Sequence, residues 1–441
     1  AYRMGDVRAA EFYKRAYEEE PDDPALYSSF LLAQNAQEAA VDELFRAHCV
    51  YDSFFKDTPR YSYRVPYHHA KIRVGYISPD FRRNVMQHFV QPLLTAYDRT
   101  RFEVYAYSTA AEPDDVTAAL RPHPTVWRDM GGMSHEEIAA RIHADEIDIL
   151  VDLAGHAAGG ALPVLARRPA PVQMMGLGYT ATSGLSDVDY FLTDDACDPV
   201  GGVSEPYFTE KLIRLPSQFI YIPRAGLPQP MGTPARRRGH ILFGVFNQYR
   251  KFTDEMLLLW RGILESVRGS KLVIKGKICS IDSGISFAKK RLSMLNYDLT
   301  RVEFRPYSPD YLEQYRDIDI ALDTAPYNGG LTTCEALYMG VPVISMRGRT
   351  HGSRFGASIL TNAGVRELIV ENDINYVRRA VQLAESPKLI AGYHAGLRAN
   401  MKRSPLMDAN GYMKELESAY REIWHRFLHC RAREKFENFS V

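Results

Sequence analysis

Three short stretches in the second half of the sequence carry side chains that could hold a diphosphate. They are the stretch Asn247-Gln248-Tyr249-Arg250-Lys251, the stretch from Tyr327 to Glu335, and residues 347–354. Each follows an apolar run that we expect to be a β-strand, so all three should meet where strands end at one edge of a sheet. Cationic side chains, glycines and helix N-termini in one place bind phosphate well. A solvated basic loop is the alternative, and the convergence at one edge favours a diphosphate site.

The stretch from Asp319 to Ser345 supplies the anion-binding turn of this predicted site. Residues 318–323 alternate apolar and polar side chains, which predicts a strand. The turn from Pro326 to Gly330 interrupts the alternation, and residues 332–339 predict a helix that stops at Gly340 before a second apolar run. A helix that begins directly after glycines offers bare backbone amides to an anion.

Glu335 has two interpretations. The pattern Thr332-x-x-Glu335 fits a capping box, in which Glu335 returns to the backbone of Thr332. The functional alternative is a carboxylate that accepts hydrogen bonds from a ribose diol, as in dinucleotide sites. Spacing does not decide between them, and the two roles are compatible.

Two Asp-x-Asp triplets have the letters of a metal-dependent transferase motif. They are Asp187-Val-Asp189 and Asp317-Ile-Asp319, both of which lead into apolar strand residues. Such triplets arise often by chance, and the sequence has neither a Walker lysine motif nor a G-x-G-x-x-G fingerprint. We therefore expect no metal and no cofactor. Cationic side chains and backbone amides would neutralise a leaving diphosphate instead.

Two histidines in the first half, His88 and His156, are predicted near strand ends that face a common cleft. A lone histidine is more often structural than catalytic. His156 is the stronger candidate because Ala154-Gly155-His156-Ala157 directly follows the apolar run 149–153. The sequence does not identify the hydrogen-bond partners of either ring.

Short apolar runs alternate with helical patterns through most of the chain, which predicts an α/β fold built on parallel sheets with helices on both faces. Residues 216–239 are rich in Pro, Gly and Arg and mark a boundary between two doubly wound domains, with a cleft between them. The predicted strands are residues 72–78, 102–108, 148–153, 172–176, 190–193, 241–246, 271–275, 301–304, 318–323 and 341–346.

The N-terminal and C-terminal parts are helical in pattern. Within residues 1–58, Ala9, Tyr13, Ala16 and Pro21 have the spacing of the second helix of a tetratricopeptide repeat, although an ordinary helical hairpin would also fit. We predict a tetratricopeptide-like segment at residues 1–58 and a linker at 59–70. Rossmann-like domains follow at residues 71–225 and 240–385, and a helical tail at 386–441.

Composition limits the class of protein. Lys and Arg total 54 and Asp and Glu total 54, and this zero net charge argues against nucleic-acid or acidic-membrane partners. The five Cys are scattered without a C-x-x-C pair, which fits a reducing cytoplasm. No run of eighteen apolar residues and no signal peptide is visible. Because the first residue is Ala, we expect the sequence to begin inside a longer gene product.

Over residues 71–430 the sequence resembles the catalytic region of the O-linked N-acetylglucosamine transferase/Spindly family of glycosyltransferases, in the bacterial form that lacks an intervening domain. The matching segments, in the family's order, are Arg73–Phe81, Leu150–His156, Arg168–Gln173 with Gly178–Gly184, Phe246–Lys251, and the stretch from Asp319 to Ser345. The resemblance implies a GT-B fold with two Rossmann-like domains facing a cleft, residues 71–225 on the acceptor side and residues 240–385 on the nucleotide-sugar side. It also implies a nucleotide-sugar donor, no metal, and inversion at the anomeric carbon.

The resemblance also implies residue roles. Gln248 and Lys251 would bind the donor diphosphate, Thr332 and Thr333 would place amides and hydroxyls on it, and Glu335 would hold the ribose. The implied donor-binding residues are Asn247, Gln248, Arg250, Tyr307, Gly330, Leu331, Thr332, Thr333, Glu335, His351 and Arg354, and the implied catalytic residues are Asn84, His88, His156 and Lys251.

One position departs from the family pattern. Where the family usually has a histidine four residues after the aspartate of Ser-Pro-Asp-Phe, this chain has Asn84. An amide cannot act as a general base, so Asn84 could only orient the sugar or acceptor. His88 and His156 remain as neighbouring candidates, or the proton could pass to water or to the diphosphate.

The leading hypothesis is an inverting, metal-independent transfer of GlcNAc from a UDP-sugar to Ser/Thr hydroxyls of protein acceptors. The alternatives are UDP-glucose or GDP-fucose as donor, a non-catalytic partner subunit of a transferase, and a nucleotide-sugar epimerase. The expected partners are a protein acceptor and the nucleotide sugar, with no nucleic acid and no membrane. Any oligomer would form through the tetratricopeptide region, and the expected location is a bacterial cytoplasm.

Overall fold

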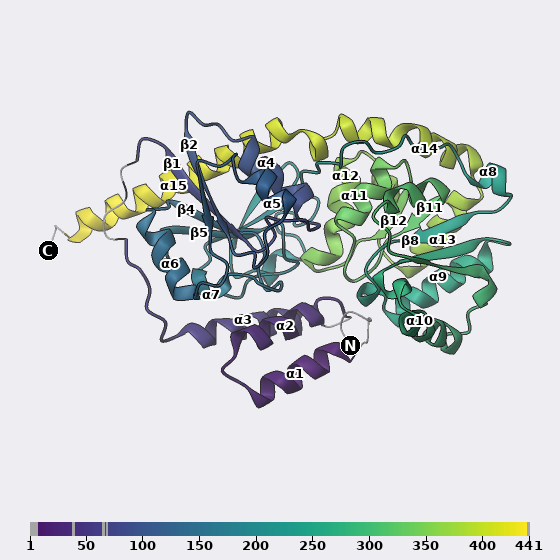
Figure 1. Ribbon diagram of the computed structural model, residues 1–441, viewed down its shortest axis with the longest axis horizontal. Coiled ribbons are helices and arrows are strands. Elements are labelled where there is room, and N and C mark those ends of the chain that lie inside the picture. Colours follow the sequence, from purple (N-terminus) through teal and green to yellow (C-terminus); the bar gives the residue numbers. More distant parts are fainter. Residues whose placement is uncertain (1–7, 38–39, 64–66, 68, 439–441) are drawn as a thin grey trace. The chain divides into compact units, whose positions relative to one another are not determined.

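The computed structural model describes residues 8–37, 40–63, 67 and 69–438, with side chains up to residue 430. Contacts divide the chain into two compact units. Unit 1 is built on Pro223–Met407 with two short N-terminal stretches, and unit 2 comprises Glu20–Leu32, Val41–Ile222 and the segment from Asp408. Each unit contains one parallel sheet with helices packed beside it (Figure 1).

The sheet of unit 2 has seven parallel strands in the order β3-β2-β1-β4-β5-β6-β7. The chain order reverses between β1 and β4, which is the switch point where ligands bind in doubly wound sheets. Tyr76 and Val151 lie opposite each other across this pair. The strands are β1 (Ile72–Ser78), β2 (Phe102–Ser108), β3 (Val126–Asp129), β4 (Ile149–Asp152), β5 (Val172–Gly176), β6 (Tyr190–Asp194) and β7 (Lys211–Leu215), and the helices between them are α4 (Gln87–Thr95), α5 (Asp115–Leu120), α6 (His135–Ala144) and α7 (Leu162–Leu165).

The sheet of unit 1 has six strands in the order β10-β9-β8-β11-β12-β13, all parallel. Its switch point lies between β8 and β11, so the loops after these two strands lie at the place where a ligand is expected. The elements are α8 (Ala235–Arg238), β8 (Leu242–Val245), α9 (Asp254–Ser266), β9 (Lys271–Gly276), α10 (Asp282–Met294), β10 (Val302–Pro306), β11 (Ile320–Leu322), α11 (Leu331–Tyr338), β12 (Val343–Met346), α12 (Phe355–Asn362), β13 (Ile369–Val370), α13 (Asp373–Ala384) and α14 (Pro387–Lys402).

The predicted α/β fold with two parallel sheets is therefore confirmed. All ten predicted strands are present within a few residues of their expected ends. The alternation of apolar residues did not indicate three further strands, β3, β7 and β13. Each of them lies at the outer edge of its sheet, where one side of a strand is not covered and the apolar pattern is weak.

The helices at the two ends of the chain complete the units. The N-terminal ones are α1 (Ala9–Glu19), α2 (Pro24–Gln34) and α3 (Val41–Val50), followed by the 3-10 helix η2 (Tyr51–Phe55). The last helix, α15 (Ala409–Asn438), packs in unit 2, where the Tyr420 hydroxyl lies 3.1 Å from that of Tyr76. The tetratricopeptide assignment of residues 1–58 stays a prediction, and residues 1–7 and 38–39 of it lie outside the described residues. Among the helices described, none is both long and apolar enough to pass through a membrane.

Candidate functional site

Helix α11 begins at the switch point of unit 1 and lacks a side-chain cap. Its N-cap residue is Gly330, and within the described chain no side chain accepts a hydrogen bond at this cap. The helix ends at Met339 and Gly340, where a φ of +83° suits glycine. The first-turn amides of an eight-residue helix with no cap of its own are well placed to receive an anion.

The turn before α11 is fixed by Asp323, which is fully buried at the end of β11. Its Oδ1 accepts hydrogen bonds from Asn247 Nδ2 at 3.1 Å and from the Gly329 amide at 2.7 Å. Its Oδ2 accepts from Ser345 Oγ at 2.6 Å. One carboxylate thus ties the loop after β8, the turn after β11 and strand β12 together. Burial raises the pKa of Asp323, and these hydrogen bonds oppose the rise.

Lys251 is the buried cation of this arrangement. It lies in the 3-10 helix η4 (Tyr249–Lys251) with 9% of its surface exposed. Its Nζ donates to Asn328 O at 2.7 Å and lies 3.5 Å from the centroid of the Tyr327 ring. Burial and the neighbouring Arg250 lower the pKa of Lys251 to about 7, against the attraction of Asp323. An anion bound here would stabilise the charged ammonium and so raise the pKa of Lys251 again.

Glu335 is buried within α11, and its carboxylate accepts a hydrogen bond from the Tyr311 hydroxyl. The Arg224 guanidinium lies 5.2 Å from the centroid of the Tyr311 ring. Burial raises the pKa of Glu335 to about 7. The capping-box interpretation is wrong, because Gly330 is the N-cap and Thr332 is already the second helical residue. The ribose assignment stays a prediction.

The two threonines of α11 and the glycine before them are closely packed. A Cβ on Gly329 would lie 2.5 Å from Thr332 Oγ1 and 2.7 Å from Thr333 Oγ1, so only glycine fits there. The Thr333 hydroxyl donates to Gly329 O at 3.1 Å. By contrast, a Cβ on Gly330 would meet nothing within 4 Å. Leu331 is buried at the start of the helix.

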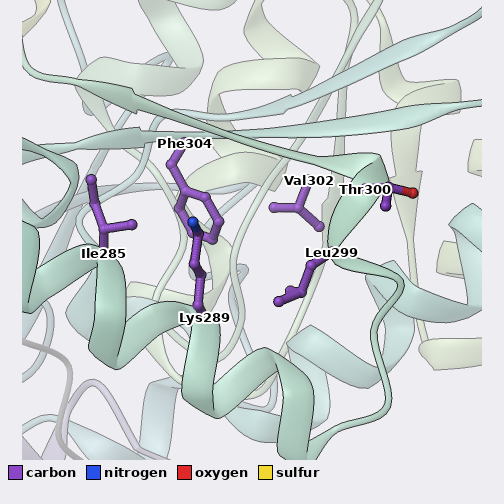
Figure 2. A pocket seen from close by; sticks show the side chains of 6 residues that line it. All are labelled: Ile285, Lys289, Leu299, Thr300, Val302 and Phe304. Atoms are coloured by element: carbon purple, nitrogen blue, oxygen red, sulfur yellow. The ribbon is translucent and has the colours of Figure 1, made fainter.

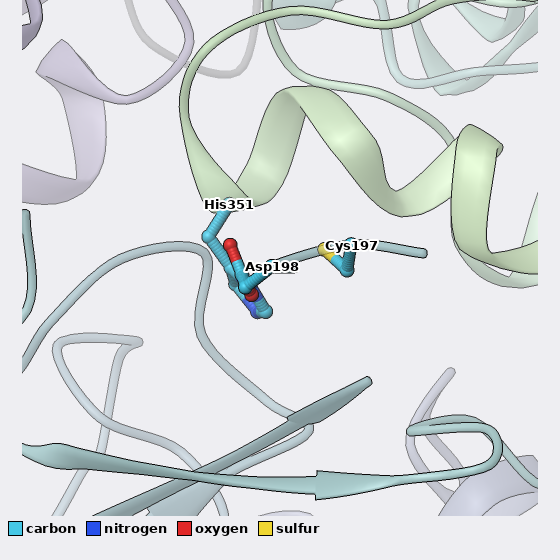
Figure 3. Close-up of side chains that lie close together, drawn as sticks. All are labelled: Cys197, Asp198 and His351. Atoms are coloured by element: carbon cyan, nitrogen blue, oxygen red, sulfur yellow. The ribbon is translucent and has the colours of Figure 1, made fainter. Parts of the chain in front are cut away.

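The remaining residues predicted for the donor site differ in exposure. Gln248 and Tyr307 are exposed, whereas Asn247 is buried and also donates to Thr324 Oγ1 at 2.9 Å. His351 is buried in the 3-10 helix η8 (His351–Arg354), which precedes α12 (Figure 3). Arg354, at the end of the same 3-10 helix, is also buried. Arg354 Nη1 donates to Gly348 O at 3.0 Å. Unit 1 therefore brings the loops after β8, β11 and β12 to one sheet edge.

His156 of unit 2 follows β4 and is buried, with both ring nitrogens engaged. Its Nε2 lies 2.8 Å from Ser183 O and its Nδ1 lies 2.9 Å from Ser28 Oγ. Burial and the neighbouring His48 lower the pKa of His156 well below its usual value. A neutral ring held from both sides is poorly placed to accept a proton from a substrate.

His88 lies in the first turn of α4 and Asn84 lies shortly before this helix, in the segment that follows β1. His88 Nδ1 donates to Ile222 O at 2.7 Å, and Gln87 Nε2 lies 3.3 Å from His88 Nε2. Asn84 Nδ2 donates to Asp80 Oδ1 at 2.5 Å. The structure therefore ties both side chains to residues of their own unit.

Four buried or partly buried residues escaped the sequence reasoning: Arg224, Tyr311 and Asp323 in unit 1 and Asp152 in unit 2. Asp152 ends β4, and its Oδ1 accepts from the amides of Ala154 at 3.0 Å and Gly155 at 2.5 Å. Burial raises the pKa of Asp152 to about 6. The signal available in the sequence was an aspartate at the end of an apolar run, which holds for both Asp152 and Asp323.

Each unit has one further feature. In unit 2, Cys197 and Asp198 follow β6, and Thr193 Oγ1 donates to Asp198 Oδ2 at 2.5 Å (Figure 3). In unit 1, a groove of about 520 Å³ lies beside α10 and the edge strand β10. The residues that line this groove are Ile285, Lys289, Leu299, Thr300, Val302 and Phe304 (Figure 2). None of them belongs to the predicted site.

Comparison with known proteins identifies one family. The sequence profile of glycosyl transferase family 41 matches residues 32–224 and 234–416. The chain is 36% identical to the probable UDP-N-acetylglucosamine–peptide N-acetylglucosaminyltransferase SPINDLY of Eustoma exaltatum subsp. russellianum, over 92% of this chain and 45% of that protein. It is also 36% identical to the SPINDLY protein of Arabidopsis thaliana, over 92% of this chain and 46% of that protein. The chain thus spans about half the length of these relatives.

A solved structure gives the same result over nearly the whole chain. A lysine-to-methionine mutant of the O-GlcNAc transferase of Thermobaculum terrenum superposes with a TM-score of 0.91 at 30% sequence identity. The match covers 97% of this chain and 83% of that one. The chain therefore has the GT-B glycosyltransferase fold, and each of its two units contains one of the parallel sheets described above.

Proposed function

The chain belongs to glycosyl transferase family 41, and on this premise we propose that it transfers a sugar from a nucleotide-sugar donor to Ser/Thr hydroxyls of protein acceptors. The relatives with 36% identity carry names that specify peptide as acceptor and UDP-N-acetylglucosamine as donor. We propose the same donor here, with UDP-glucose and GDP-fucose as alternatives.

The observation that carries the proposal is a buried lysine beside a helix N-terminus that has no side-chain cap. Lys251 Nζ bonds to Asn328 O, and Asn328 belongs to the same turn that leads into α11. A doubly charged leaving group would meet the ammonium and the first-turn amides of α11 together. Charge that develops on a departing diphosphate is stabilised most by such fixed groups in a site that excludes water.

In the proposed reaction the acceptor hydroxyl oxygen forms a bond to the anomeric carbon of the sugar. The bond from that carbon to the donor phosphate oxygen breaks, and its electron pair stays on the diphosphate. A single displacement of this kind inverts the anomeric centre. We assign the leaving group to Lys251 and the amides of α11, and the ribose to Glu335.

The hydroxyl proton needs an acceptor other than Asn84. His156 uses both ring nitrogens within unit 2, and burial disfavours its charged form. We therefore assign the proton to a phosphate oxygen of the donor or to water, which electrostatic stabilisation of the leaving group would permit.

We propose that the transfer needs no metal ion. Lys251 is a cation already buried at the site, and Arg250 contributes to its electrostatic environment. These charges would take the part that a divalent cation plays in metal-dependent transferases. The same proposal includes two further assignments. Unit 2 forms the acceptor side, and helices α1–α3 have a peptide-binding role.

A donor panel tests the function. The purified protein is incubated with UDP-GlcNAc, UDP-glucose or GDP-fucose and with candidate acceptor proteins, and the acceptors are analysed by mass spectrometry. The proposal expects one N-acetylhexosamine on Ser or Thr, with UDP-GlcNAc preferred. Transfer from no donor in the panel, to any acceptor, would contradict it.

A non-catalytic partner subunit is the second candidate, and Asn84 in place of the family's usual histidine favours it. The distinguishing measurement is release of UDP from UDP-GlcNAc by the purified protein alone. Measurable turnover would remove this candidate, whereas donor binding without turnover would support it over the leading proposal.

A further inference from the structure

The hydrogen bonds of His156 define its tautomer. A carbonyl oxygen only accepts, so the contact with Ser183 O at 2.8 Å places the ring hydrogen on Nε2. Burial favours the neutral ring, in which Nδ1 has only a lone pair, so Ser28 Oγ, 2.9 Å away, donates to it. The imidazole is neutral and held along its length between a backbone carbonyl and one hydroxyl group.

Aromatic rings close around this imidazole. The Tyr51 ring meets it edge-on with centroids 4.4 Å apart, and the Tyr179 ring lies at 5.1 Å. His48 lies at 5.5 Å and is itself fixed, because its Nδ1 donates to Leu44 O at 2.7 Å and its Nε2 accepts from the Tyr179 hydroxyl at 2.9 Å. The His48 and Tyr179 side chains are thus anchored, and together with the Tyr51 ring they confine the imidazole.

The backbone that carries His156 is equally confined. Gly155 has a φ of +55°, and a Cβ at this position would lie 2.6 Å from Tyr179 Cβ. The amides of Ala154 and Gly155 donate to Asp152 at the end of β4. The loop after β4 is therefore shaped by packing on one side and by the His156 hydrogen bonds on the other.

The partners of His156 come from two distant parts of the sequence. Ser183 belongs to the loop after β5, whereas Ser28 lies on α2, His48 on α3 and Tyr51 on η2. Residues 28 and 156 are 128 positions apart. The Rossmann-like part thus supplies the hydrogen bond between Ser183 and the imidazole, and the N-terminal helices supply the one from Ser28.

We propose that Ser28 is a positioning residue, through which helix α2 holds the His156 loop in the geometry used for sugar transfer. The helical segment is then a working part of the transferase unit and does more than present acceptor peptide. Removal of the hydroxyl leaves Nδ1 without its donor and lets the ring rotate within its aromatic surroundings. This inference rests on the proposed function in one respect, namely that the loop after β4 contributes to transfer.

Burial agrees with this role. It lowers the pKa of His156 well below the usual value and that of His48 to about 4, so both rings stay neutral at physiological pH. A neutral ring with a fixed tautomer keeps its hydrogen bonds over the whole working range of pH. Two carboxylates lie close to these residues: Asp152 accepts from the backbone amides of Ala154 and Gly155, and the buried Glu210 accepts from the Ser183 amide at 2.7 Å.

The first test reads the tautomer directly in the full chain. Nitrogen-15 NMR of histidine-labelled protein should show His156 with a protonated Nε2 and an unprotonated, hydrogen-bonded Nδ1, and Ser28→Ala should shift the Nδ1 resonance. A protonated Nδ1 in the unmodified protein, or a Nδ1 resonance unchanged by Ser28→Ala, would overturn the inference. This measurement needs no activity, so it remains decisive even if the proposed function fails.

The second test separates positioning from general stability. Ser28→Ala should lower kcat by about tenfold or more while the KM for UDP-GlcNAc changes by less than about twofold, because misplacement of a loop affects the reacting geometry and not donor binding. Ser28→Thr keeps the hydroxyl and should restore kcat. Ser29→Ala is the matched control, since the neighbouring Ser29 hydroxyl donates only to Ala25 O on the exposed side of the same helix.

Equal kcat values for Ser28→Ala and Ser29→Ala would overturn the inference. So would a Ser28→Thr protein that is as slow as Ser28→Ala despite a restored Nδ1 resonance. If the unmodified protein transfers no sugar from any donor, the proposed function is contradicted. The NMR result alone then decides whether Ser28 donates a hydrogen bond to His156 Nδ1.

Discussion

Burial brings Lys251 and Glu335 toward neutrality from opposite directions. Removal from water disfavours the charged form of each, so the pKa of the lysine falls to about 7 and that of the glutamate rises to about 7. Each residue is then ready to regain its charge when a complementary group arrives. A diphosphate would favour the ammonium, and the hydroxyl donors of a ribose would favour the carboxylate.

These two shifts predict how donor affinity depends on pH. Below about pH 7 Glu335 takes up a proton and loses acceptor capacity, and above about pH 7 Lys251 loses the charge that attracts the diphosphate. The affinity for UDP-GlcNAc, measured by calorimetry, should therefore be highest near neutral pH. It should fall by up to about tenfold for each pH unit on either side.

The control for this profile is a pair of variants. Glu335→Gln cannot be protonated and should lose the acid limb, while Lys251→Met should lose the alkaline limb and bind more weakly throughout. A wild-type profile that is flat between pH 5.5 and 8.5, or an acid limb that survives in Glu335→Gln, would contradict the assignment.

For single residues, the sequence indicated the charged side chains of the site more readily than the side chains that contact them. Lys251 and Glu335 were candidates because they follow predicted strands or turns, and the family resemblance supplied their predicted roles. Tyr311 and Arg224 were missed because their contacts with each other and with Glu335 join segments far apart in the chain. The capping-box interpretation failed because helix α11 begins one residue earlier than its pattern suggested, after Gly330.

At the scale of elements, the turn into α11 depends on a glycine that has no room for a side chain. Gly329→Ala should push apart the Thr332 and Thr333 hydroxyls and displace the first turn of α11, because its Cβ would lie 2.5 and 2.7 Å from their oxygens. Overpacking of this kind costs about 1–3 kcal/mol of stability. Affinity for UDP-GlcNAc should fall more than this loss alone explains, as measured by calorimetry on the folded variant.

Gly330→Ala tests the same turn without the clash, since its Cβ would meet nothing within 4 Å. Its thermal unfolding temperature should match that of the unmodified protein. A Gly329→Ala protein that binds UDP-GlcNAc normally would show that the amides of α11 do not hold the diphosphate.

Strand prediction succeeded for the interior strands of both sheets and for one edge strand, β10. Leu242–Val245 and Ile149–Asp152 are buried along their whole length and read as continuous apolar runs. The missed edge strands β3 and β7 contain Arg and Lys side chains and exposed positions that interrupt such runs. An edge strand is defined by the neighbour it pairs with, and a single sequence does not show this neighbour.

At the scale of the whole molecule, the sequence indicated two parallel sheets and the boundary near residues 216–239. It did not show that the chain returns to unit 2 after Met407. Helix α15 packs there through Leu416, Tyr420, Ile423 and Trp424, which are buried, and Glu417 accepts the Asp98 amide at 2.7 Å. A helical pattern gives the apolar face of a helix but not the surface that covers it.

This packing predicts a measurable loss of stability. Tyr420→Ala should destabilise unit 2 by about 3–5 kcal/mol through the cavity it leaves. Tyr420→Phe, which removes only the hydroxyl bonded to Tyr76, should cost about 1 kcal/mol in urea unfolding. The exposed neighbour provides the control, because Arg421→Ala should change the free energy of unfolding by less than about 0.5 kcal/mol. A Tyr420→Ala protein as stable as the Arg421→Ala protein would show that α15 is dispensable.

The central claim is that a buried lysine and helix amides, without a metal ion, drive sugar transfer by a family 41 glycosyltransferase. Its most direct test is the intact mass of an acceptor protein after incubation with UDP-GlcNAc and EDTA. We predict that the unmodified chain adds N-acetylhexosamine as fast with EDTA as without it. We predict that Lys251→Ala adds none while retaining its fold. Transfer abolished by EDTA, or undiminished in Lys251→Ala, would contradict the account.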